Sequence, residues 1–263
     1  ILLHAAPRAR ALYITGASRG CFFFKKKKNP PPPPPPPPAM KRDDLQFFDK
    51  TQDFAVFDQR RLPHWIQAGT LCFITWRVAD SLPQGILKQL DAEIDQYLTT
   101  LGISIIQELP DFLEKSDLKT RSQIHWRMFT IRDHFLNRGM GRCPLRNPIH
   151  AYIVLDSLRT FDEDRYFLTD AVVMPNHVHF IAAFGDNDSM LQQCTAWKRF
   201  TGRAINQLEG RTGEFWQADQ FDHLIRGERQ FAYFRQYISE NPTKPKLREG
   251  EFLHWSKNLD NTK

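Results

Sequence analysis

Cysteine is scarce in this sequence, and long apolar runs are absent. The four cysteines, Cys21, Cys72, Cys143 and Cys194, lie far apart and form no CxxC pair. This spacing is typical neither of a structural zinc site nor of a disulfide framework, so a reducing cytoplasm is the expected compartment. No stretch approaches the roughly 18 to 20 apolar residues of a membrane-spanning helix, and no membrane association is expected.

Acidic residues are missing from the first 39 positions, which contain seven cations. The net charge of +6 belongs to this segment, because the rest of the chain has 29 basic and 30 acidic residues, a net charge of −1. The overall basicity therefore does not predict a nucleic-acid partner for the domain. If DNA is the partner, a local patch of cations must bind it.

The same segment has the composition of a low-complexity tail. It contains "FFFKKKKN" followed by a proline run at residues 30–38, and such runs form polyproline II rather than a packed core. Residues 1–39 are therefore expected to be a disordered or mistranslated tail, with Met40 as a plausible start. Residues 40–263 are expected to form a single domain.

The pattern from Met40 onward predicts an α+β domain with helices packed on an antiparallel sheet. Strands are expected within residues 69–83, 165–175 and 177–184, the last two as a hairpin, and residues 213–225 are expected to be extended. Helices are expected at about 84–102, 121–137, 148–161, 189–208 and 227–241. Ser189 is the expected N-cap of its helix, and Pro242 is expected to end the last one.

Two histidines stand one residue apart in "MPNHVHFIAAF". Side chains at i and i+2 of a strand point to the same face, so His177 and His179 project together while Val178 points into the core. Two imidazoles at this spacing can hold one metal ion between them. The alternative is two ordinary strand histidines without a ligand, and a structural zinc site would need more ligands than this pair provides.

The context of this pair resembles the histidine–hydrophobic–histidine (HUH) motif of single-tyrosine DNA transposases. The segments "RRLPHWIQAGTLCFITWRVADSLP", "AWKRFTGRAIN", "GEFWQADQFDHLIR" and "YISENPTKPKL" are similar, in the same order, to the REP-associated tyrosine transposases. The resemblance covers about residues 60–247. Residues 84–148 are its least recognisable part and are expected to be a helical insertion.

The resemblance implies an HUH endonuclease fold with a ferredoxin-like or RRM-like core, and a metal-dependent reaction. The two histidines and an amide or acid oxygen would hold Mg²⁺ or Mn²⁺, and Tyr237 in the "YI..NP" element would attack the DNA to form a 5′-phosphotyrosine. Asn241, four residues later on the same helix face, would be the third ligand. A helix C-cap is the other interpretation of Asn241. Tyr233 is either a packing residue or a second nucleophile.

Basic and aromatic side chains indicate where DNA would bind. The candidate DNA-binding residues are Lys198, Arg199, Arg203, Trp216, His223 and Arg226, and Arg229 and Arg235 extend the basic cluster before the tyrosine. Basic side chains hold phosphates and aromatic rings stack on unpaired bases, although a solvated helix face and core packing are the respective alternatives. His223 is family-like but has no assignable role.

The function that follows from the resemblance is nicking and strand transfer on single-stranded, hairpin-bearing DNA. A domesticated or inactive protein that binds hairpins without cleaving them is the alternative. The expected partner is single-stranded or hairpin DNA, and the expected assembly is a monomer or a homodimer.

Overall fold

The computed structural model describes residues 39–57 and 64–259. The predicted tail at residues 1–39 lies, apart from Ala39, outside the described residues, so its disorder and its translation stay predictions. No helix in the described part of the chain is long and apolar enough to cross a membrane.

The described residues form short strands and longer helices. The strands are β1 (Ala55–Phe57), β2 (His64–Ile66), β3 (Cys72–Arg77), β4 (Tyr166–Val173), β5 (His177–Phe184), β6 (Phe221–Leu224) and β7 (Leu253–Ser256). The helices are α1 (Gln84–Thr100), α2 (Leu109–Lys115), α3 (Leu118–Leu136), α4 (Pro148–Arg159), α5 (Ser189–Leu208) and α6 (Glu228–Glu240). Short 3-10 helices lie at η1 (Arg42–Asp44), η2 (Ile106–Glu108), η3 (Pro144–Arg146) and η4 (Asn241–Thr243).

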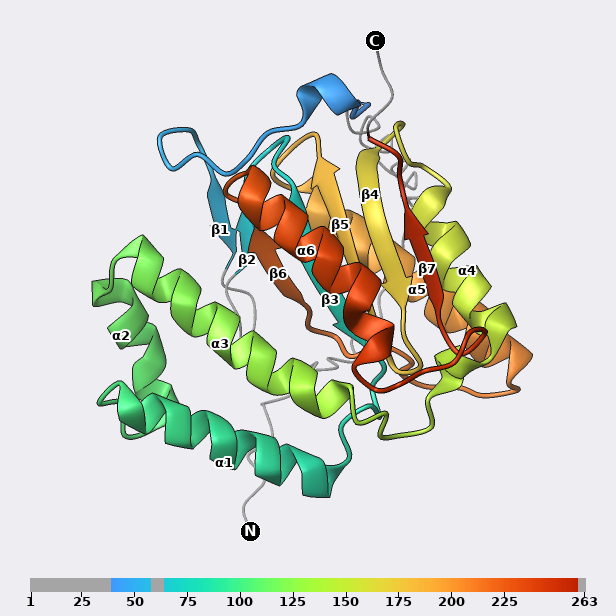
Figure 1. Cartoon of the computed structure of the whole chain (residues 1–263), viewed down its shortest axis with the longest axis horizontal. Coiled ribbons are helices and arrows are strands. Elements are labelled where there is room, and N and C mark those ends of the chain that lie inside the picture. The colour runs from blue at the N-terminus through green and yellow to red at the C-terminus, as the bar shows by residue number, and fades with distance from the viewer. Residues whose placement is uncertain (1–38, 58–63, 260–263) are drawn as a thin grey trace, which may run out of the picture. The chain divides into compact units, whose positions relative to one another are not determined.

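Five strands form one antiparallel sheet in the order β6-β3-β5-β4-β7, which places the histidine strand β5 at its centre. β4 and β5 form the predicted hairpin, and β1 pairs with β2 in a separate two-stranded sheet. This antiparallel sheet with packed helices confirms the predicted α+β class. Figure 1 shows α6 lying across one face of the sheet.

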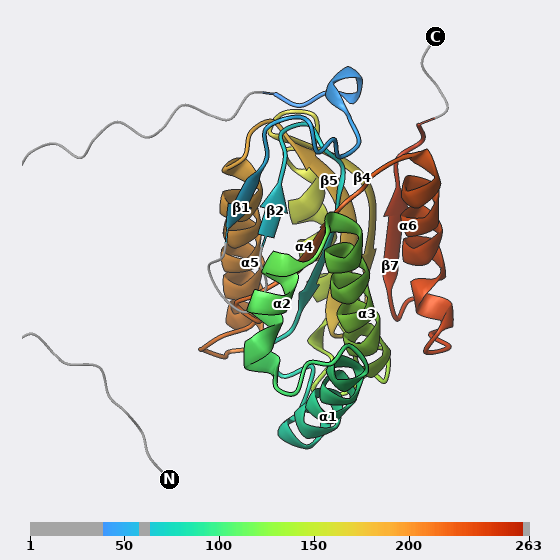
Figure 2. The same ribbon diagram turned by 90° about the vertical axis from the view of Figure 1, so that its left-hand side faces the viewer.

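Alternation along β5 divides the core between the two faces of the sheet. Val178 and Phe180 belong to a cluster with Trp197 of α5 and with residues of α4. Ile181 lies in the opposite cluster, which includes Phe234 of α6. Figure 2 shows α6 on one side of the sheet and α5 on the other. His177 and His179 therefore face α6 rather than α5.

Helix α3 packs on α1 with some of its side chains and on the sheet with others. One set of its side chains packs on α1 in a separate apolar cluster that includes Leu90, Ile94 and Ile124. Phe129, also on α3, stacks on Phe221 of β6 with ring centroids 4.2 Å apart. The same helix thus contacts both α1 and the sheet face that carries the histidines.

Two local expectations need correction. Helix α5 begins at Ser189, and its N-cap residue is Asp188, whose side chain makes no capping hydrogen bond. The side chain of Asp186 accepts instead from the backbone N–H groups of Asp188 and Ser189, at 2.9 and 2.7 Å. A charged carboxylate is a stronger acceptor than a hydroxyl, and the Ser189 hydroxyl instead donates to the Asp186 carbonyl. Strands β1, β2 and β7 are absent from the expected elements, because each has only three or four residues.

Candidate active site

The two histidines lie at the start of the central strand and are both buried, with 1% and 0% of their surfaces exposed. Their ring centroids are 4.7 Å apart. In each ring Nδ1 has a partner: that of His177 is the side-chain oxygen of Asn176 at 2.7 Å, and that of His179 is the hydroxyl of Thr75 at 2.7 Å. Neither Nε2 atom makes a hydrogen bond of good geometry with a described residue.

Asn176 fixes the protonation of His177. Its amide nitrogen donates to the carbonyls of Leu136 and Met140, both at 3.2 Å, so its oxygen must face the imidazole. His177 therefore carries its proton on Nδ1 and a lone pair on Nε2. Burial lowers the pKa of His177 to about 3 and also lowers the pKa of His179, which keeps both rings neutral. A neutral imidazole with a free Nε2 is the form that binds a metal.

Asp133 of α3 completes a group of three possible metal ligands. Ligand atoms of Asp133, His177 and His179 all lie within 4.8 Å of one another, and Asp133 Oδ1 is 3.2 Å from His179 Nε2. The residue is 4% exposed, and its Oδ1 makes no hydrogen bond of good geometry to a described residue. Burial alone would raise the pKa of Asp133, but its contacts with the histidines and Lys244 outweigh burial and hold the pKa below its usual range.

Asp133 is not among the site residues predicted from the sequence, although its position carries a signal. The acid stands four residues after Phe129 and three before Leu136, both of which are buried on α3. Helical spacing therefore places its carboxylate on the buried side, where an unpaired acid is costly. An acid in such a stripe is a candidate ligand, but only the fold shows that it faces His179.

Tyr237 of α6 contacts the same carboxylate. Its hydroxyl donates to Asp133 Oδ2, which also accepts from the side-chain amide of Asn137 at 2.9 Å. Lys244 Nζ lies 3.5 Å from Oδ2 and 3.6 Å from the centroid of the Tyr237 ring. Burial and then the charge of Asp133 raise the pKa of Tyr237 above its ordinary value, so the phenol is protonated in this arrangement.

Asn241 is the C-cap residue of α6, one of the two roles expected for it, and its backbone N–H donates to the Ile238 carbonyl. Its side chain is fully buried, and neither amide atom makes a hydrogen bond of good geometry to a described residue. The Asn241 side chain lies close enough to His177 to raise the pKa of that histidine, against the larger lowering effect of burial. A buried amide without well-placed partners is unusual in a folded protein and marks a position that a ligand would satisfy. The ligand role of Asn241 remains a proposal.

Tyr233 differs from Tyr237 in exposure and contacts. It is 49% exposed, and its ring packs against Tyr237 and Trp126 with centroids 6.3 and 6.0 Å away. No hydrogen bond joins it to Asp133 in the described structure. Of the two tyrosines, Tyr237 is the one whose hydroxyl reaches the acid and histidine group.

A cavity of about 690 Å³ adjoins Asp133. It lies between the helices α1 and α3 and the edge of the sheet at β6, and its lining includes Thr75, Phe129 and Gln217. Its charged lining residues are of both signs: Arg77, Asp91, Asp95, Arg132, Asp133 and Asp219. Among the lining residues, Asp133 is the one that belongs to the group with the two histidines.

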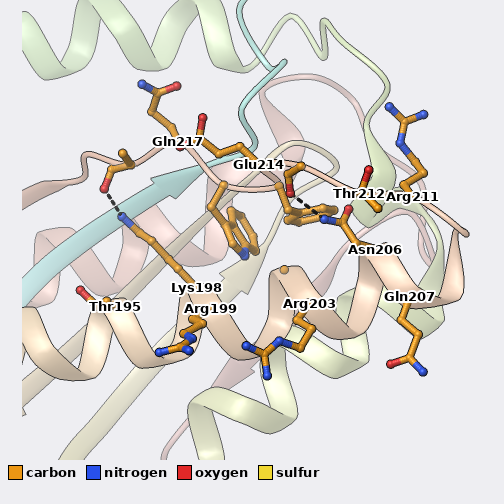
Figure 3. Close-up of a pocket in the computed structure, with 15 residues that line it drawn as sticks. Thr195, Lys198, Arg199, Arg203, Asn206, Gln207, Arg211, Thr212, Glu214 and Gln217 are labelled. Atoms are coloured by element: carbon orange, nitrogen blue, oxygen red, sulfur yellow. Dashed lines mark hydrogen bonds between the residues drawn. The ribbon is translucent and has the colours of Figure 1, made fainter. Parts of the chain in front are cut away.

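The predicted DNA-binding residues do not gather at this cavity. Lys198, Arg199 and Arg203 lie along α5, on the opposite side of the sheet from the histidines. They line an open groove of about 610 Å³ between α5 and residues 211–218 (Figure 3). Trp216 also borders the groove, but it is only 4% exposed and its indole N–H donates to Thr201 at 2.8 Å. Its packing is that of a core residue, the alternative left open above.

His223 and Arg226 lie near β6, apart from the groove. His223 is buried, contacts Gln230 at 3.0 Å, and has its pKa lowered to about 3, chiefly by burial. Arg226 donates to the hydroxyl of Ser122 on α3. These contacts connect β6 and the residues after it to the helices α3 and α6. A role in DNA binding stays a prediction for both residues.

Comparison with known proteins adds a likeness of fold at low similarity. No protein-family model and no curated protein sequence matches this chain. One solved structure, described as a REP-associated tyrosine transposase bound to a REP hairpin, is similar to this chain at 17% sequence identity and a TM-score of 0.34. The alignment covers 70% of this chain and 72% of the transposase chain. A likeness at this level gives no information on function.

Proposed function

We propose that this protein is a metal-dependent endonuclease and strand transferase that acts on single-stranded, hairpin-bearing DNA through a covalent bond to Tyr237. The observation that carries the proposal is the position of one buried carboxylate, Asp133, which lies within 4.8 Å of ligand atoms of both histidines and accepts the hydrogen bond of the Tyr237 hydroxyl. The order of the sequence motifs supports the same function. A tyrosine that packs for structural reasons alone does not require two unsatisfied imidazole nitrogens beside it.

The residues present fit a divalent cation. His177 Nε2, His179 Nε2 and Asp133 Oδ1 are buried, close together and without well-formed hydrogen bonds in the described structure, and the amide of Asn241 is similarly unsatisfied. A set of two imidazoles and oxygen donors suits Mn²⁺ better than Mg²⁺, which favours an all-oxygen shell. A cation bound here would polarise the scissile phosphate and offset its developing charge.

The protein's own groups would position and deprotonate the nucleophile. The Tyr237 oxygen would form a bond to phosphorus while the bond from phosphorus to the 3′ oxygen breaks. The products would be a 5′-phosphotyrosine and a 3′ oxygen that takes a proton from water to become a free 3′-hydroxyl. Asp133 Oδ2 already accepts the hydrogen bond of the phenol and would take its proton as the oxygen–phosphorus bond forms, when that proton becomes strongly acidic. Lys244 lies over the ring and would stabilise negative charge near the tyrosine oxygen.

The test is formation of a covalent adduct. Purified protein is incubated with labelled hairpin oligonucleotides that carry single-stranded flanks, in Mn²⁺, Mg²⁺, Zn²⁺ or EDTA, and is resolved on a denaturing gel. We expect a labelled protein band with Mn²⁺ or Mg²⁺ and none in EDTA. Asp133→Asn, which keeps the side-chain volume but removes the proton acceptor, should reduce the band at least about 100-fold.

The alternative function is decided in the same experiment. A protein that binds the hairpins tightly but forms no adduct with any of the metals would be a hairpin-binding protein that does not cleave. An adduct that forms equally well in EDTA would contradict the metal-dependent mechanism.

A further inference from the structure

The groove on α5 has a charge that the domain as a whole lacks. Its lining includes four cationic side chains and a single acidic one, Glu214. The cations are Lys198, Arg199, Arg203 and Arg211. Because residues 40–263 have a net charge of −1, this local excess does not follow from the composition of the domain.

Three of these cations have no partner among the residues that the structure describes. Arg199, Arg203 and Arg211 make no side-chain hydrogen bond, ion pair or ring contact with any described residue, and all three are exposed. Lys198, in contrast, donates to the backbone carbonyls of Ala218 and Asp219 at 3.2 and 3.3 Å. The three guanidinium groups are thus available to an outside anion, and guanidinium binds phosphate through paired hydrogen bonds.

The groove is held in shape by close packing. A Cβ added at Gly202 of α5 would lie 3.1 Å from Phe215 Cβ and 3.4 Å from Trp216 Cδ1, so helix and loop approach as closely as glycine allows. The Asn206 side chain donates to the Gly213 carbonyl at 2.9 Å, which joins the far end of the loop to the helix (Figure 3). The cations therefore project from a rigid surface.

The geometry favours paired DNA over a single strand. Figure 3 shows Arg199 and Arg203 next to each other on α5. Their spacing of four residues corresponds to about 6 Å along the helix axis, which lets them reach neighbouring phosphates of one strand. A single-strand site usually offers several exposed aromatic rings for stacking, but the two aromatic residues that line the groove, Phe215 and Trp216, are only 4% exposed. The exposed ring of Phe200, on the same helix, lies outside the lining of the groove.

One residue links this groove to the proposed active site. Gln217 lines both the α5 groove and the cavity that includes Asp133. It lies just before β6, the edge strand of the sheet, so a chain could pass around this edge from one face to the other. The groove and the cavity at Asp133 thus share one lining residue.

We propose that the α5 groove binds the paired stem of hairpin DNA by its phosphates, and that the strand leaving the stem crosses Gln217 to the cavity at Asp133. The inference rests on the proposed function for the identity of the substrate. The groove itself needs neither a metal nor Tyr237 to bind the stem.

The first experiment measures binding in EDTA, so that no cleavage is involved. The affinities of a blunt hairpin and of an unpaired strand of equal length are determined by fluorescence anisotropy over a range of salt concentrations. The double variant Arg199→Ala/Arg203→Ala should bind the hairpin at least about tenfold more weakly, and the slope of log affinity against log salt should fall by about 2. Its affinity for the unpaired strand should change little.

Two controls accompany this variant. Lys88→Ala/Lys119→Ala removes two exposed cations from α1 and α3, and it should bind the hairpin as the wild type does. Arg199→Lys/Arg203→Lys keeps the charges and should retain most of the affinity and the salt slope. Because Arg199 and Arg203 have no partners in the described residues, thermal unfolding of both groove variants should match the wild type.

The route past Gln217 is tested with a second hairpin that carries a single-stranded flank. Wild-type protein should bind it more tightly than the blunt hairpin, and Gln217→Trp should abolish this gain while it keeps the affinity for the blunt hairpin. An unchanged gain would show that the strand takes another path.

Three results would overturn the groove assignment. Equal loss of affinity for paired and unpaired DNA would make this face a single-strand site, with stacking from Phe200, which is 62% exposed. Unchanged hairpin affinity would exclude the groove altogether. A shift of oligomeric state without a change in DNA affinity would show that the face binds a second copy of the chain. None of these outcomes depends on adduct formation, so the two proposals can fail separately.

Discussion

A divalent cation should stabilise this protein through the histidine pair. His177, His179 and Asp133 bring three ligand atoms to within 4.8 Å of one another, and the histidine Nε2 atoms lack well-formed hydrogen bonds in the described structure. Unfolding would disperse these ligands, so a cation that binds them favours the folded state. The change to make is His177→Ala or His179→Ala.

The size of the effect follows from mass action. A cation present at 100 times its dissociation constant adds about 2.7 kcal/mol to the free energy of unfolding. For a domain of about 200 residues each kcal/mol raises the melting temperature by about 2 to 4 °C, so the shift should be about 5 to 10 °C. If the loss of one imidazole weakens binding about 100-fold, the same concentration adds only about 0.4 kcal/mol, a shift of about 1 °C.

The assay is thermal unfolding of the wild type and the variants in EDTA and across a Mn²⁺ titration. His223→Ala is the matched control, because it also removes a buried imidazole but lies outside the ligand group. It should lower the melting temperature in EDTA yet keep the full shift with Mn²⁺. If the His177 and His179 variants keep that shift, or His223→Ala loses it, the assignment of the metal site is wrong.

Three further predictions concern other parts of the structure. Burial alone would lower the pKa of His64, but Asp219 and Asp222 raise it to about 9. The contribution of protonated His64 to the free energy of unfolding is complete below pH 6.5, and it should fall by roughly 3 kcal/mol as the pH rises from 6.5 to 9. Urea unfolding should show this decline in the wild type and a shallower one in His64→Gln, and identical pH slopes would contradict the contact. Arg235→Ala should lower the free energy of unfolding by about 1 to 3 kcal/mol in urea, because it removes the guanidinium 3.0 Å from a buried carboxylate; an unchanged midpoint would argue against the pair. Tyr233→Phe should retain the covalent DNA adduct on a denaturing gel, since the Tyr233 hydroxyl does not contact the ligand group, and loss of the adduct would make it a second nucleophile.

Much of the fold could be predicted from local patterns. The hairpin β4–β5 and the helices α1, α4, α5 and α6 follow from periodicity, prolines and turns within single segments. Strand β7 could not be predicted, because it has four residues with alternating half-buried and exposed side chains, and its pairing with β4 is a long-range contact. Such short strands are determined by tertiary contacts rather than by propensity.

The candidate site likewise contains some residues that local patterns predict and others that only the fold brings into place. His177, His179 and Tyr237 belong to motifs within single elements, so they could be proposed as site residues from the sequence alone. Asp133 comes from the least recognisable segment, and nothing local indicates that α3 packs against the face of β5. Arg235 shows the reverse case: its charge suggested a contact with DNA, which stays a prediction, and only the fold shows that its side chain also pairs with Asp170.

The most direct test of the central claim is peptide mapping of the DNA adduct by mass spectrometry. Wild-type protein is trapped with a hairpin oligonucleotide and Mn²⁺, digested with nuclease and protease, and searched for a nucleotide-bearing peptide. The account predicts a 5′-phosphorylated nucleotide on Tyr237 and no adduct from Tyr237→Phe. A nucleotide on Tyr233, or an adduct that persists in Tyr237→Phe, would contradict the assignment of the nucleophile and of the carboxylate that accepts its proton.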